Sequence, residues 1–201
     1  GDAVTCGQFG MPAVALCGSA WGYLRESGEI GDWLDDYEEI IYVTDADKAG
    51  ENVVTGNNND YAMANALGAL LWIGRTPSMA WTRPDGKEKS IKDVNDIAQW
   101  MKDTNSSDWG EFNSISMQAE RIVVTAARYA GTLGGNARSE MVNKIIKPMI
   151  LSIPAEKRTE DGLDRKLAYA LYPNAAKSAA TADYNKWLKA SQNAAIERAD
   201  A

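Results

Sequence analysis

Two aspartates one residue apart, Asp45 and Asp47, are the residues of this chain whose type and spacing best suit chemistry. They follow residues 40–43, an apolar, β-branched run typical of a strand buried on both faces of a parallel sheet. Ligands in open α/β sheets bind at the carboxyl ends of strands, and Mg²⁺ is commonly held by one or two carboxylates with water and substrate phosphates. The pattern predicts a Mg²⁺ or Mn²⁺ site. The alternative is a turn at Asp45 and a helix N-cap at Asp47.

A second feature that suits a ligand is the small-residue turn containing Gly18 and Ser19. It follows residues 12–16, another short apolar run that is predicted to be a strand. Backbone N–H groups exposed in such a turn, at the carboxyl end of a strand, allow close approach of a phosphate. Glycine and serine also form ordinary turns, so this alternative stays open.

Strands, loops and helices must alternate through the first half of the chain to place these turns at one edge of a sheet. That order implies parallel strands joined by right-handed crossovers. The pattern of apolar residues, with Gly and Pro as end signals, predicts helices over residues 1–10 and 21–27, and a helix in two pieces over 50–71 that residues 56–59 interrupt. It predicts strands over 12–16, 40–43 and 78–82, and an acidic cluster at 91–100 that runs straight into a helix.

The second half of the chain begins after a polar stretch at residues 104–112, where a domain boundary is expected. Beyond this stretch the apolar residues recur with helical spacing only. The pattern predicts an all-α region with helices over residues 116–132, 137–153, 160–172 and 182–199.

Charge is divided unevenly along the chain, whose net charge is −7. Residues 1–110 hold 8 basic and 18 acidic residues, a net −10, whereas residues 111–201 hold 13 and 10, a net +3. The acidic half is therefore a poor binder of nucleic acid unless metal ions intervene. The chain has no histidine, which excludes Cys/His zinc sites and His-based triads from it. Cys6 and Cys17 fit reduced, buried thiols of a cytosolic protein, and no apolar run approaches the ~20 residues that cross a bilayer.

The order of the motifs resembles the Toprim domain of bacterial and phage primases and primase–helicases. In that family one strand ends in a Gly-(Thr/Ser)-Ala turn, the next ends in Asp-x-Asp-x-Ala-Gly, and a later loop carries Lys-Asp-x-(Asn/Asp)-(Glu/Asp). The matching pieces here are a helix opening on Asp2, then residues 12–20, 40–50, 81–86 and 92–96. The resemblance implies a Rossmann-type parallel sheet with flanking helices over residues 1–105, followed by a helical domain over residues 111–201.

The resemblance also implies an activity, which is Mg²⁺-dependent RNA primer synthesis from nucleoside triphosphates on single-stranded DNA, in the cytoplasm of a bacterial or phage-infected cell. Asp45, Asp47 and Asp93 would hold the metal and act in catalysis. The expected nucleotide and phosphate contacts are Gly18, Ser19, Lys48, Arg83, Lys92 and Asn95. A replicative helicase is a candidate partner.

One departure from the family is the missing Glu-Gly strand, which normally precedes the helix that opens on Asp2. We expect an upstream segment or a further chain to supply it, and the chain alone to be inactive. Two alternatives stay open: a Toprim-type nuclease or topoisomerase-like enzyme that uses the same acids, and a degenerate Toprim that serves as a replisome interaction module. The missing glutamate favours the second of these.

Overall fold

The computed structural model describes residues 2–14, 37, 39–46, 72–77, 79–106, 115, 119–160 and 162–199. The chain forms two compact units. The N-terminal unit comprises Gly1–Ala66 with Leu71–Glu120, and the helical unit comprises Leu67–Leu70 with Arg121–Ala201. The predicted combination of strands and helices, with a helical C-terminal region, is confirmed. The predicted boundary at residues 105–111 falls before the observed division between residues 120 and 121.

The main sheet contains β1 (Ile41–Thr44), β2 (Trp72–Arg75) and β5 (Glu120–Arg121) in the order β1-β2-β5. β1 and β2 are parallel, so their carboxyl ends lie at the same edge. Gly74 allows this sheet to pack closely, since a Cβ there would lie 2.8 Å from Ile115 Cγ2. The predicted strand over residues 40–43 is confirmed. β2 was not predicted, because its four residues directly follow the helix predicted through residue 71 and are too few to show the alternation of a strand.

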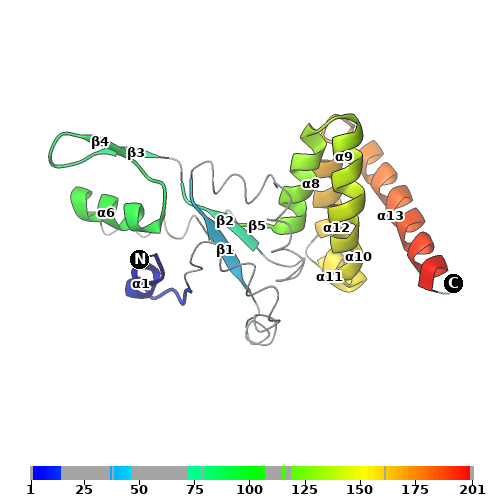
Figure 1. The fold of residues 1–201 in the computed structure, drawn as a ribbon, viewed down its shortest axis with the longest axis horizontal. Helices are drawn as coiled ribbons and strands as arrows, with labels where there is room; N and C mark the ends of the chain where they lie inside the picture. The colour runs from blue at the N-terminus through cyan, green and yellow to red at the C-terminus, as the bar shows by residue number, and fades with distance from the viewer. Residues whose placement is uncertain are drawn as a thin grey trace. The chain divides into compact units, whose positions relative to one another are not determined.

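A separate two-stranded sheet is formed by β3 (Ala80–Thr82) and β4 (Glu88–Ser90), which pair antiparallel (Figure 1). The strand predicted over residues 78–82 therefore exists, but the prediction that it belongs to the parallel sheet is wrong. The turn after it reverses the chain: Gly86 has φ +81°, which suits glycine, and its N–H donates to the Arg83 carbonyl at 2.9 Å.

The expected strand over residues 12–16 is not supported where the structure describes it. Residues 12–14 belong to no strand, and the Val14 side chain is 59% exposed. An exposed valine without a neighbouring strand gains no burial from an extended conformation, so local sequence preference alone does not form a strand here. The predicted helices over residues 21–27 and 50–71 lie outside the described residues.

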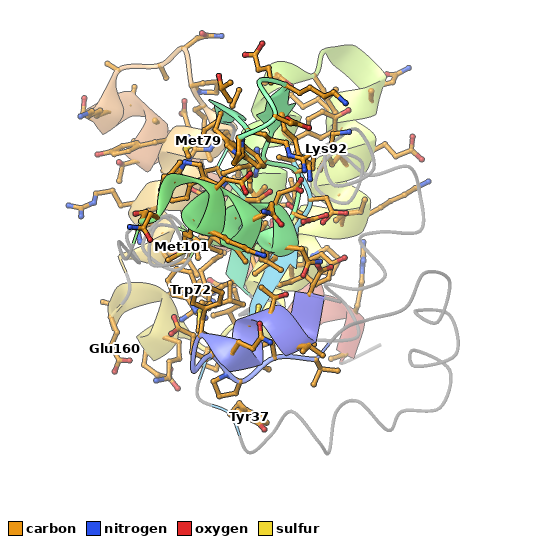
Figure 2. All side chains as sticks on the ribbon, turned by 90° about the vertical axis from the view of Figure 1, so that its left-hand side faces the viewer. Tyr37, Trp72, Met79, Lys92, Met101 and Glu160 are labelled. Carbon is orange, nitrogen blue, oxygen red and sulfur yellow. The ribbon has the colours of Figure 1, made fainter. Side chains whose placement is uncertain are left out.

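Helices α1 (Asp2–Gln8) and α6 (Val94–Thr104) pack against each other in the N-terminal unit (Figure 2). The first matches the helix predicted over residues 1–10, and the second is the helix expected at the acidic cluster of residues 91–100, which begins inside that cluster at Val94. α6 buries one face, and its C-terminus is closed by Asn105 in the left-handed conformation. Cys6 on α1 has a free, partly buried thiol, and Cys17 lies outside the described residues. The core here contains Trp81, Ile91, Val94, Ile97, Met101 and Ile115.

The helical unit is all-α after β5, and α8 and α13 both pack against α12 (Figure 1). The helices predicted over residues 137–153, 160–172 and 182–199 exist with shifted ends, and α11 was not predicted. The helix predicted from residue 116 is observed as α8, which begins at Ile122 because β5 precedes it. Its elements are α8 (Ile122–Thr132), α9 (Gly135–Met141), the π-helix η1 (Val142–Ile146), α10 (Lys147–Ser152), α11 (Ala155–Glu160), α12 (Leu163–Leu171) and α13 (Lys177–Ala199).

The π-helix η1 lies directly before Pro148, in the first turn of α10. Proline lacks an N–H and its ring would clash with the carbonyl four residues earlier, so a local change of hydrogen-bond register relieves the conflict. In the part of the chain that the structure describes, no helix has the length and apolar character needed to span a bilayer.

Candidate metal and nucleotide site

The end of β1 meets the acidic loop, by which we mean residues 92–96. Ala46, the residue after Asp45, donates its N–H to the Lys92 carbonyl at 2.7 Å. Thr76, the residue after β2, donates its hydroxyl to the same carbonyl at 2.9 Å. These two hydrogen bonds bring the Asp-x-Asp region and the Lys-Asp-x-Asn-Asp motif together at the carboxyl edge of the sheet. Figure 2 labels Lys92 near the start of α6.

Asp93 is the N-cap of α6. Its Oδ1 accepts a hydrogen bond from the Asp96 N–H at 2.8 Å, and its backbone is extended with φ −139°. Within the described part of the chain, no hydrogen bond engages its other oxygen, Oδ2. Asp45 is exposed at the surface. Asp93 is half-buried, and the bond between Ala46 and Lys92 brings the backbones beside Asp45 and Asp93 to the same edge. Asp47 lies outside the described residues.

Asp96, the last residue of the acidic loop, is buried and has both carboxylate oxygens engaged. Its Oδ2 accepts the Lys92 N–H at 3.0 Å, and its Oδ1 lies 2.5 Å from Lys89 Nζ on β4. A carboxylate whose oxygens are both engaged is a poor metal ligand, so Asp96 differs in role from Asp93. Sequence reasoning placed Asp96 on the loop but did not identify its partners. Its spacing from Asp93, that of a capping box, was a usable signal.

Asn95 connects the acidic loop to α1. Its amide nitrogen donates to Asp2 Oδ1 and its amide oxygen accepts from the Thr5 hydroxyl. These bonds occupy the side chain that was expected to contact a nucleotide. Asp2 itself has a raised pKa, chiefly because of partial burial and then because of the negative charge of Asp93. The positive N-terminal amino group lowers this pKa, and the negative charge of Asp96 raises it by less. Two carboxylates of the acidic loop therefore act on Asp2.

Arg83 and Lys92 lie in different surroundings. Lys92 is exposed and adjoins Asp93 in the chain. Arg83 lies at the turn of the β3–β4 hairpin, where its guanidinium is 3.8 Å from Asp85 and 3.9 Å from Asp103. Asp103 is ten residues along α6 from Asp93, or about 15 Å at 1.5 Å per residue. The structure therefore does not bring Arg83 to the acidic loop.

The donor set fits a hard divalent cation in its chemistry. Asp45 and Asp93 offer carboxylate oxygens, which Mg²⁺ prefers. Among the described residues, no three Asp, Glu, Cys or His side chains are grouped as a metal-binding cluster. The remaining predicted residues lie outside the described ranges; these are Gly18, Ser19, Asp47 and Lys48.

Three comparisons with known proteins bear on this site. No protein-family model matches the chain, and neither a curated protein nor a solved structure matches it. Function must therefore be inferred from the residues of the site and from the order of the motifs.

Proposed function

We propose that this chain provides a Toprim-type site for Mg²⁺-dependent nucleotidyl transfer, the reaction by which a primase makes an RNA primer on single-stranded DNA. The observation that carries this proposal is the 2.7 Å hydrogen bond between Ala46 N–H and the Lys92 carbonyl. It joins two acidic motifs through residues that are 46 positions apart in the sequence, at the edge of the sheet where ligands bind.

Each residue has a distinct part in the proposed reaction. Asp45 and Asp93, together with Asp47, would hold the metal. The bound metal would neutralise the triphosphate and polarise the attacking and leaving oxygens. Lys92, exposed beside Asp93, would contact a phosphate of the nucleotide as a mobile positive charge. Arg83 is left out of this site because Asp85 and Asp103 engage it elsewhere.

The family's sites also use a glutamate from a Glu-Gly strand, and no residue of the described ranges is assigned to that role here. A second polypeptide that carries such a strand is therefore part of the proposal. Asp2, the first residue of α1, is hydrogen-bonded to Asn95, so the start of this helix lies beside the acidic loop.

Metal binding tests the proposal first. Mn²⁺ titrated into the full chain should broaden NMR resonances of residues 45–47 and of the acidic loop. Asp45→Asn and Asp93→Asn should each weaken Mn²⁺ binding about tenfold, or about 1.4 kcal/mol, because each removes a charged ligand. Asp85→Asn is the matched control, since it removes an acid from the hairpin turn, and should leave the affinity unchanged. Broadening centred elsewhere would exclude the assigned site.

Activity tests the reaction class. Mixed with a polypeptide that carries the family's Glu-Gly strand, the chain should make primer from labelled nucleotides on a single-stranded template. This synthesis should depend on Mg²⁺, and Asp45→Asn should abolish it. Shortening of an end-labelled template without primer synthesis would instead identify a nuclease. Equally fast synthesis without the added polypeptide would show that another acid takes the place of the glutamate.

A further inference from the structure

The β3–β4 hairpin is attached to both ends of α6. Trp81 on β3 donates its Nε1–H to Asp103 Oδ2 at 3.0 Å, near the end of the helix. Lys89 on β4 places its Nζ 2.5 Å from Asp96 Oδ1, near the beginning of the helix. Trp81 and Lys89 are opposite each other in the hairpin. Asp96 and Asp103 are seven residues apart, or two helical turns, so they lie on one face of α6.

In the pair at the beginning of α6, the carboxylate is largely removed from solvent, whereas the lysine is partly exposed. The Asp96 side chain is 10% exposed, and the Lys89 amine lies 5.7 Å from the centre of the Trp81 ring. Burying a carboxylate is unfavourable unless a cation and hydrogen-bond donors satisfy it. Lys89 supplies the cation, and the Lys92 N–H supplies a donor to the other oxygen.

Asp96 is connected to both residues of the acidic loop that the proposed function uses. Its Oδ2 holds the Lys92 N–H, and its own N–H is bonded to Asp93 Oδ1. The Lys92 carbonyl in turn holds the Ala46 N–H at the end of β1. A single chain of bonds therefore runs from Lys89 on the hairpin, through Asp96, to the edge of the main sheet.

We propose that Lys89 and Asp96 are positioning residues, which fix the acidic loop so that the Asp93 carboxylate is held beside Asp45 for metal binding. This inference rests on the proposed function. An ordinary capping box would explain only part of the geometry. In a capping box the third helical residue returns to the N–H of the N-cap residue. Here Asp96 bonds the residue before the N-cap, and its second oxygen binds a lysine from another element.

The test uses the full chain and three variants of this pair. Lys89→Met removes the charge but keeps the stem over Trp81, Asp96→Asn keeps the size of the side chain, and Lys89→Arg keeps the charge. The matched control is Glu140→Gln, which breaks the Lys144–Glu140 pair of the helical unit. That pair has the same 2.5 Å separation, but its side chains are 71% and 63% exposed.

Lys89→Met and Asp96→Asn should each weaken Mn²⁺ binding about tenfold, the lower end of the range seen when partners of metal ligands are removed. The double variant should be no weaker than Asp96→Asn, since both changes break one chain of contacts. Lys89→Arg keeps the charge, so its Mn²⁺ affinity should stay within about twofold of wild type. The Lys92 and Asp96 amides should exchange hydrogen faster in both weakened variants, and Glu140→Gln should change neither measurement.

Two results would overturn the inference, and they are distinguishable. If Lys89→Met and Asp96→Asn lower the unfolding midpoint but bind Mn²⁺ as tightly as Glu140→Gln does, the pair stabilises the fold only, and the proposed metal site stands. If wild type shows no Mn²⁺ binding at the acidic loop, the proposed function fails and positioning for metal fails with it. Lys89→Met keeps the test usable if Asp96→Asn does not fold, because the Lys89 side chain is 42% exposed.

Discussion

Each unit contains a polar network around a buried charged residue, Arg158 in one and Asp96 in the other, and the two networks differ in charge balance. In the helical unit, Arg158 donates from Nη1 to the carbonyls of Ile150 and Ile153, at the end of α10. Its Nε lies 3.2 Å from Asp164 Oδ1, an ion pair without hydrogen-bond alignment. The same oxygen accepts the Tyr184 hydroxyl at 2.7 Å. One positive charge therefore meets one negative charge, and neutral donors and acceptors complete the network.

The network of the N-terminal unit is unbalanced. Asp93 and Asp96 both act electrostatically on Asp2, and the N-terminal amino group offsets part of this effect, while Lys89 pairs with Asp96. The pKa of Asp2 is raised chiefly by burial and then by the charge of Asp93. A balanced network stabilises the fold through its own contacts. An unbalanced network retains repulsion that a bound cation would relieve, which is a common property of functional sites.

Breaking the balanced network should have the largest effect. Arg158→Met should lower the free energy of unfolding of the helical unit by about 3 kcal/mol, because it removes the cation beside Asp164 and the donor to two carbonyls. The value lies at the lower end for a buried pair, since the Asp164 side chain is 34% exposed. Urea denaturation followed by circular dichroism at 222 nm would measure it.

The control for this prediction is Arg165→Met, which removes a positive charge from the exposed side of α12. It should change the free energy of unfolding by less than about 0.5 kcal/mol. Equal destabilisation by the two variants would show that Arg158 contributes through net charge only, and that its buried contacts add nothing.

Two glycines, one in each unit, compare how tightly the two units are packed. A Cβ at Gly131 of α8 would lie 2.4 Å from the Ala170 carbonyl oxygen, part of the backbone of α12. At Gly74 of β2 it would meet Ile115 Cγ2 at 2.8 Å, the end of a side chain that can move. We expect Gly131→Ala to lower the free energy of unfolding by about 2 to 3 kcal/mol, and Gly74→Ala by about 1 kcal/mol.

Gly134→Ala is the neutral control, because nothing lies within 4 Å of a Cβ at that position. Thermal unfolding of the three variants would rank the effects. Gly74→Ala costing more than Gly131→Ala would mean that the N-terminal unit is packed more rigidly than the helical unit.

A pH dependence isolates the contribution of Tyr184 to the balanced network. Burial raises the pKa of Tyr184 well above its usual range, and the hydrogen bond to Asp164 raises it further. The unfolded tyrosine ionises near pH 10, while the folded one stays neutral, so the unfolded state binds fewer protons above that pH. The free energy of unfolding should therefore fall as pH rises above 10, by up to about 1.4 kcal/mol per pH unit.

Tyr184→Phe should remove this part of the slope and lower the free energy of unfolding at pH 7 by about 1.5 kcal/mol, through loss of a hydrogen bond to a charged group. Urea denaturation at intervals between pH 8 and 11 would compare the variant with wild type. The pKa of Tyr172 is also raised by burial, so only the difference between the two proteins reports on Tyr184. Parallel slopes would contradict the assignment.

Several elements could be predicted from the sequence because they depend on neighbours in the chain. The apolar run before Asp45 is observed as β1, and the turn between residues 82 and 87 reverses the chain as its Pro-Asp-Gly residues require. Most helices of the second half also follow from the spacing of apolar residues. Such periodicity determines which segment becomes a helix or a strand.

Only the tertiary structure decided how these elements pair. β2 forms because residues 72–75 lie beside β1 and bury Ile73, although nothing in so short a segment distinguishes it from the end of a helix. The same holds for the acidic loop. Its composition suggests metal binding at every acid. The contact with Lys89 instead makes Asp96 a buried, paired group. Asp93 becomes a helix cap with one oxygen engaged. The role of a carboxylate depends on which charges and donors the fold brings to it, and those partners come from distant parts of the chain.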